Sequence, residues 1–102
     1  MSENIIKLSK PIKAHGEDVH SLTLREPTTE DIIDIGLPTL IIVGDGETAG
    51  VEIRQKVVAK YISTLAAIPM SSVRSLAPKD FSACTQEVMG FFGQGDEETP
   101  AS

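Results

Sequence analysis

Residues 21–31 constrain the fold most strongly, because this segment changes from a strand pattern to a helix pattern within a few residues. Its two leucines alternate with polar residues, which is the period-two pattern of a half-buried strand. Pro27 ends the strand because it has no N–H to donate to a neighbouring strand. Thr28 is a suitable N-cap, and Asp31, three residues later, can reach back to it. The sequence therefore predicts a strand followed directly by a capped helix.

An N-terminal hairpin is predicted from two segments, residues 4–13 and 19–25, joined by a turn at residues 14–18. The apolar side chains that share one face of the first segment are Ile6, Leu8 and Ile12. Pro11 indicates an edge strand or a bend within it. Because an isolated two-stranded hairpin is marginally stable in water, its apolar face must pack on helices or on another chain.

The rest of the chain is predicted to be mainly helical, with three to four helices. The predicted helices are residues 29–35, residues 49–67, residues 71–76, and a last one that opens at Pro78 and is closed by Gly93. Residues 37–43 fit a buried helical turn or a short strand equally well, and residues 44–47 have the composition of a loop. The predicted fold class is α+β, an N-terminal β-hairpin followed by a mainly helical body.

With 102 residues, the chain is long enough for one domain, predicted at residues 1–93, followed by an acidic tail at 94–102 that we expect to be disordered. The net charge of −6 argues against nucleic acid and anionic membrane as partners, since both need a basic face. The apolar runs are too short to span a bilayer. Cys84 is the single cysteine, so no internal disulfide can form, which suits a reducing cytosol.

Charge is segregated along the sequence. Residues 26–53 contain seven acidic residues and no Lys or Arg, whereas residues 54–95 contain five basic residues and two acidic ones. Such a division can steer a partner or a second copy of the chain, or can be a solvated surface of mixed sign.

No cluster of residues predicts catalysis, a cofactor or a metal site. The glycine-rich segment 44–50 lacks the Lys of a phosphate-binding loop, and its acidic residues would repel phosphate. His15, His20 and Cys84 have no metal-binding spacing. Cys84 lies on an apolar helical stripe, where a thiol behaves as a small hydrophobic group. The sequence predicts a protein that is not an enzyme.

The end of the last predicted helix is the best candidate for a binding surface. Val88, Met89, Phe91 and Phe92 place large apolar groups immediately before a polar tail. They can complete the core, or they can form a partly exposed patch that binds another protein. A segment that switches between two states would do both.

Three features together resemble the small tail assembly chaperones of contractile-tailed bacteriophages, in particular protein E of phage P2 and the Mu-like families. These features are the hairpin with Lys10-Pro11-Ile12, the stretch Leu22-Thr23-Leu24-Arg25-Glu26-Pro27-Thr28, and helices that end in Phe91-Phe92. The resemblance covers roughly residues 5 to 92. It offers no catalytic residues to assign.

The resemblance implies a non-enzymatic protein that acts in the host bacterial cytoplasm. It would bind the phage tape measure protein and keep it soluble until tail tube subunits enclose it. The tail tube protein and a second copy of the chain are further candidate partners. The alternative function is a tail structural or connector protein retained in the virion.

The resemblance also implies a longer form of the protein made by a −1 ribosomal frameshift. Gly90-Phe91-Phe92 can be encoded as GGU UUU UUY, which contains the slippery run U UUU UUY. The acidic tail would then belong only to the unshifted product, and the frameshifted form would be another partner.

Overall fold

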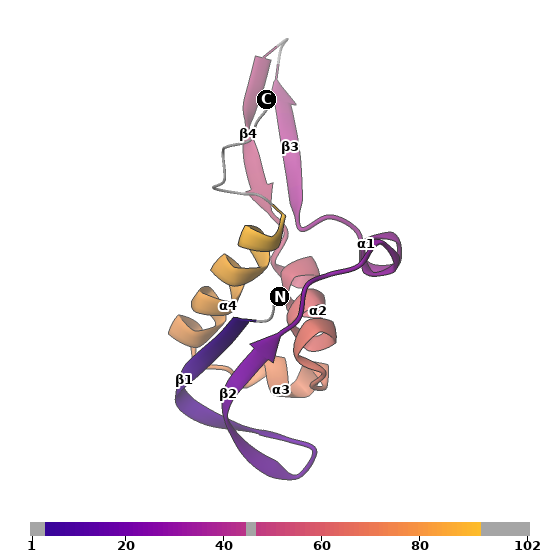
Figure 1. Cartoon of the computed structure of the whole chain (residues 1–102). Helices are drawn as coiled ribbons and strands as arrows, with labels where there is room; N and C mark the ends of the chain where they lie inside the picture. The colour runs from indigo at the N-terminus through magenta and orange to yellow at the C-terminus, as the bar shows by residue number, and fades with distance from the viewer. Residues whose placement is uncertain (1–3, 45–46, 93–102) are drawn as a thin grey trace.

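The computed structural model describes residues 4–44 and 47–92, which form two antiparallel hairpins and four helices (Figure 1). The first hairpin pairs β1 (Asn4–Ala14) with β2 (Glu17–Leu24), and the second pairs β3 (Thr39–Gly44) with β4 (Glu47–Ile53). The helices are α1 (Thr29–Ile35), α2 (Gln55–Ala66), α3 (Met70–Arg74) and α4 (Pro78–Phe91). The predicted α+β class, with an N-terminal hairpin and a helical body, is confirmed. The predicted tail at 94–102, the closure of the last helix at Gly93 and the Asp45-Gly46 part of the predicted loop lie outside the described residues.

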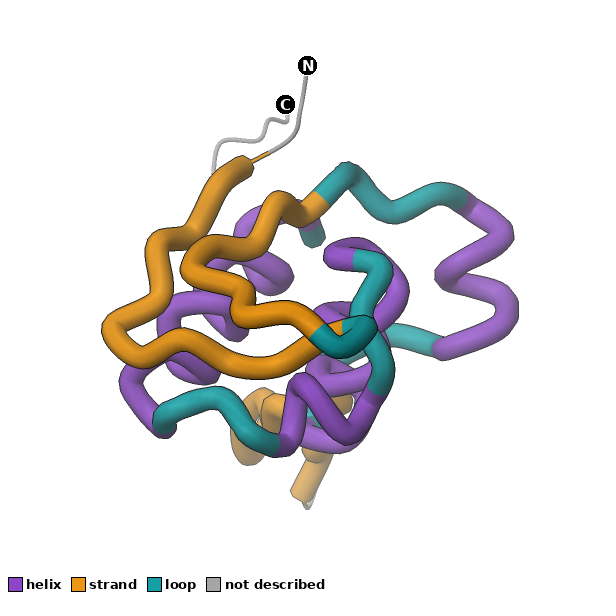
Figure 2. Tube along the Cα trace, turned by 90° about the horizontal axis from the view of Figure 1, so that it is seen from below, coloured by secondary structure: helices purple, strands orange, loops and turns teal. Residues whose placement is uncertain are grey.

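The core lies between the first hairpin and the helices. β1 packs against α4 and β2 against α2. Figure 2 shows strands lying across the helices. Leu22 and Leu24 are almost completely buried, as their alternation in the sequence predicts. The inward-facing side chains of both layers form one cluster, made of Ile6, Ile12, Ala14, Leu22, Leu24, Val57, Val58, Tyr61, Ile62, Leu65, Ile68, Val73, Leu76, Cys84, Val88 and Met89. Through this cluster the apolar face of the first hairpin packs on the helices, as the stability of an isolated hairpin requires.

The strand-to-helix switch is formed as the sequence predicts. The Thr28 hydroxyl accepts from the Asp31 N–H at 3.2 Å, and the Asp31 carboxylate accepts from the Thr28 N–H at 2.8 Å, which completes a capping box at the start of α1. Arg25, the residue after β2, donates to the same carboxylate at 2.8 Å. The hydrogen bond from the Arg25 side chain, together with the one from the Thr28 backbone N–H, lowers the pKa of Asp31 to about 2.

The hairpin of β1 and β2 contains a marked irregularity at Pro11. Lys7 pairs with Ser21 and Ile12 with Val19, so four residues of β1 face one residue of β2. The backbone N–H groups of Ser9 and Lys10 turn away from β2 and donate to the carboxylate of Asp80 in the first turn of α4, at 2.9 and 3.3 Å. The bend predicted from Pro11 is therefore stabilised by a helix 70 residues away in the sequence.

The predicted helix at 49–67 is wrong in its first part. Residues 47–53 form β4, and the helix begins at Gln55. By spacing, Val51 continues the apolar stripe of Val58 and Ile62. However, Thr48, Val51 and Ile53 are β-branched and Gly50 disfavours a helix, so the local preference is for a strand. The ambiguous residues 37–43 supply its partner, β3. Arg54 donates its backbone N–H to Pro38 at 2.7 Å and closes the base of this second hairpin, which extends away from the helices (Figure 1).

Candidate functional site

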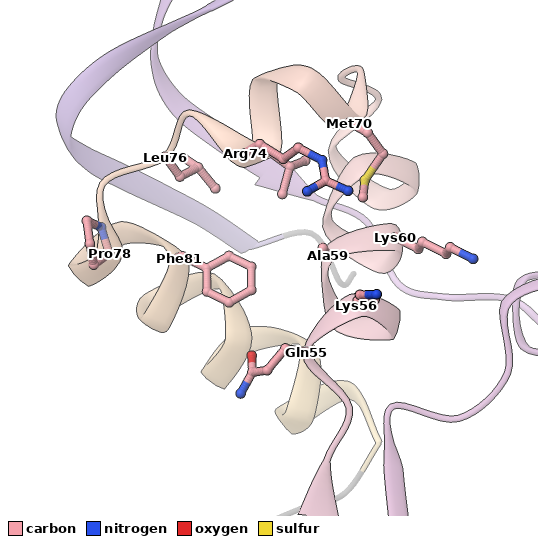
Figure 3. Close-up of a pocket in the computed structure, with 10 residues that line it drawn as sticks. Gln55, Lys56, Ala59, Lys60, Met70, Arg74, Leu76, Pro78 and Phe81 are labelled. Atoms are coloured by element: carbon pink, nitrogen blue, oxygen red, sulfur yellow. The ribbon is translucent and has the colours of Figure 1, made fainter.

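An apolar hollow lies between α2, α3 and α4, on their side away from the first hairpin (Figure 3). Its volume is about 460 Å³. The lining residues are Gln55, Lys56, Ala59, Lys60, Met70, Val73, Arg74, Leu76, Pro78 and Phe81. We call this hollow the basic groove. A second hollow, of about 540 Å³, shares Gln55 and Phe81 with it and continues along α4 and to Ile53 of β4.

The basic groove follows from how α2 divides its faces. Val58, Tyr61 and Ile62 are buried towards the hairpin, so the residues between them face the other side. On that other side the small Ala59 leaves room between α2 and α4, and Phe81 forms the facing wall from α4 (Figure 3). The groove exists because the small side chain of Ala59, on the face of α2 away from the hairpin, leaves space where α2 approaches α4.

Three cations stand at the groove and none of its ten lining residues is acidic. Lys56 and Lys60 are four residues apart and lie on one face of α2. Arg74 comes from the last turn of α3 and extends over the groove (Figure 3). The surface is therefore positive around an apolar floor, although the chain as a whole carries a charge of −6. An apolar helix flanked by acidic side chains complements such a surface.

The four residues predicted as a binding surface do not line this groove. Val88 is fully buried and Met89 is 7% exposed, which fits the core interpretation for these two residues. Phe91 and Phe92 are partly buried against the same core. The Phe92 ring meets Tyr61 edge to face, with the ring centres 5.2 Å apart.

Asp80 is a structural residue that the sequence analysis did not single out. Asp80 is 3% exposed, and its carboxylate accepts from the N–H and hydroxyl groups of Ser9 and from the N–H of Lys10. These hydrogen bonds, the Ser9 N–H first among them, lower the pKa of Asp80. An Asp in the first turn of a helix is ordinary, so only the three-dimensional contact with β1 reveals this role.

Residues with chemically reactive side chains are kept apart in the structure. Burial raises the pKa of the Cys84 thiol to about 11, so it stays protonated at neutral pH. His15 lies in the hairpin turn, where its Nε2 is 3.1 Å from the carbonyl oxygen of Ala67. Within residues 4–44 and 47–92, no three His, Cys, Asp or Glu residues are grouped for a metal ion. No helix in these ranges has the length and apolarity needed to cross a bilayer.

Comparison with known protein families gives one match that covers most of the chain. A sequence model of the phage tail assembly chaperone proteins "E, or 41 or 14" matches residues 5–93. No curated protein and no solved structure gives a significant match.

Proposed function

Because this chain belongs to the phage tail assembly chaperone family, we propose that it binds the tape measure protein of its phage and keeps it soluble until the tail tube forms. The family supports a role in tail assembly and is generally non-enzymatic. On this proposal the chain works by binding alone, without a cofactor, in the cytoplasm of the host bacterium. Residues 1–93 form the binding domain, and the acidic residues 94–102 increase solubility.

The basic groove is the observation that carries this proposal. A long helical protein presents apolar stripes that have no partner before assembly, and such stripes aggregate. A groove between two helices receives an amphipathic helix in the way that many helix-binding proteins do. Phe81 and Ala59 supply the apolar contact, and the cations at the rim attract acidic residues beside the stripe.

The end of α4 provides a second candidate contact. Phe91 and Phe92 are partly exposed, so a partner can reach them without unfolding the helix. Val88 and Met89 are buried and would reach a partner only if the last turn of α4 opened. We therefore propose the two phenylalanines as direct contacts and assign Val88 and Met89 to their support.

Co-expression with the tape measure gene tests the proposal. We expect the tape measure protein to become soluble and to co-purify with the chaperone. The double variant Lys56→Glu/Lys60→Glu should lose most of this co-purification, because it reverses the charge at the groove. The matched control Lys7→Glu/Lys10→Glu reverses two exposed charges on β1 and should retain it. An insoluble tape measure protein with both the wild type and a frameshifted form would reject the chaperone role and favour a component retained in the virion.

The frameshift proposal is tested separately on the gene. The codons for Gly90, Phe91 and Phe92 must contain the run U UUU UUY, and a longer product must be detectable by mass spectrometry. UUC at Phe91 would exclude this slippery site.

A further inference from the structure

The helix α1 presents an apolar surface that the described residues 4–44 and 47–92 leave uncovered. None of its residues is buried, and the Ile33 side chain is 76% exposed. Leu37, just beyond the helix, is 54% exposed. Figure 1 shows α1 standing away from the body beside α2. We call Ile33 and Leu37, with the exposed acidic residues Glu30 and Asp34, the α1 knob.

Both ends of α1 are held in place. The capping box and the Arg25–Asp31 ion pair fix its N-terminal end. At its C-terminal end, the buried Tyr61 hydroxyl donates to the carbonyl oxygen of Gly36 at 2.5 Å. The backbone of α1 is therefore anchored at both ends, which reduces the conformational entropy lost when the α1 knob docks.

The α1 knob and the basic groove are complementary. The knob has apolar side chains flanked by acidic ones, and residues 26–53 contain no Lys or Arg. The groove has an apolar floor with Lys56, Lys60 and Arg74 at its rim. No residue of α1 lines the groove of its own chain, among the residues that the structure describes, and the anchors at both ends of α1 keep it outside. A second copy of the chain can supply the missing contact.

We propose that the α1 knob of one copy docks into the basic groove of another copy. The two surfaces are different, so the contact is head to tail, and each copy keeps one free knob or groove to extend the assembly. Self-association then covers the groove while the tape measure protein is absent. This regulatory role rests on the proposed function, in which the tape measure protein competes for the same groove.

Self-association of the purified chaperone alone tests the inference. The wild type should form oligomers whose mass in analytical ultracentrifugation rises with concentration and falls with added salt. Ile33→Asp removes the apolar tip of the knob, and Lys60→Glu reverses a groove charge. Each variant alone should sediment as a monomer of 10.9 kDa. The control Ile5→Asp, which replaces an apolar side chain 69% exposed on β1, should associate like the wild type.

Mixing the two variants identifies the contact. The Ile33→Asp chain keeps a working groove and the Lys60→Glu chain keeps a working knob, so the mixture should form a species of twice the chain mass and no larger. Adding Asp34→Lys to the Lys60→Glu chain should restore self-association by exchanging the two charges. Circular dichroism establishes that every variant is folded.

Several results would overturn the inference. A wild type that stays monomeric throughout the micromolar range would overturn it. An Ile33→Asp variant that still associates would also overturn it, and this result is expected if the second hairpin pairs between copies. A mixture that stays monomeric would show that knob and groove do not meet. The proposed function fails on different evidence, since Ile33→Asp leaves the groove free and should still co-purify with the tape measure protein.

Discussion

Tyr61 provides a sharp test of how the helical body holds α1. Its side chain is fully buried, its hydroxyl donates to the carbonyl oxygen of Gly36 at 2.5 Å, and its ring meets Phe92 edge to face. Burial raises the pKa of this hydroxyl above its usual value, so it remains a donor at neutral pH. The substitution Tyr61→Phe removes the donor and leaves the ring packing unchanged.

The expected cost follows from the single hydrogen bond that is lost. One intramolecular hydrogen bond contributes a net stability of about 1 kcal/mol. For a chain of this length, that loss lowers Tm by roughly 4–8 °C. The edge-to-face contact with Phe92 does not depend on the hydroxyl. A second variant, Phe92→Leu, should therefore cost a separate ~1 kcal/mol for the aromatic pair.

Urea unfolding followed by circular dichroism measures both effects. Fluorescence is unsuitable, because the chain has no Trp and Tyr61 is its one tyrosine. The double variant should lose the sum of the two single losses. An unchanged unfolding free energy for Tyr61→Phe would refute the role assigned to the hydroxyl, and a loss above about 3 kcal/mol would mean that the ring packing had changed as well.

Three further predictions concern single side chains. The pKa of Asp80 in the folded protein lies below the usual 3.8, so the ionised carboxylate stabilises the fold above pH 3.8, and this stabilisation is lost as the pH falls through the folded-state pKa. Asp80→Asn should therefore lower the urea midpoint at neutral pH and make that midpoint less dependent on pH in the acid range. Cys84 is fully buried and its thiol has a pKa of about 11, so a thiol reagent at pH 8 should react far more slowly with the folded protein than with the protein unfolded in urea. Equal rates for the folded and the unfolded protein would contradict the burial of Cys84. Thr28→Ala removes the cap of α1 and should cost about 1 kcal/mol in urea unfolding, with no loss if the capping box is not formed in solution.

Local sequence signals predicted the elements whose pattern has one interpretation. The alternation before Pro27, the Thr28 cap and the Pro78 helix start each depend on neighbouring residues, and the structure contains all three. The second hairpin was missed because the spacing of Val51 from the apolar residues of α2 outweighed the strand preference of the β-branched residues around it. The pairing of β4 with β3, which the sequence of β4 alone does not show, completes this strand.

The candidate site depends on contacts between distant segments. The basic groove joins the second face of α2 to α3 and α4, and neither the sequence of α2 nor that of α4 marks the hollow between them. The apolar spacing of Val88 correctly placed it on a stripe, but spacing alone cannot distinguish a stripe that faces the core from one that faces a partner. The contact of Asp80 with Ser9 spans 71 residues and has no local pattern.

Site-specific photo-crosslinking can show whether the tape measure protein binds in the basic groove. A photoreactive amino acid replaces Lys60 at the basic groove or, as a control, Lys7 on β1, in cells that also make the tape measure protein. We expect a covalent adduct with the tape measure protein from position 60 and little or none from position 7. Adducts from position 7 alone, or from neither position while the two proteins co-purify, would contradict binding in the groove.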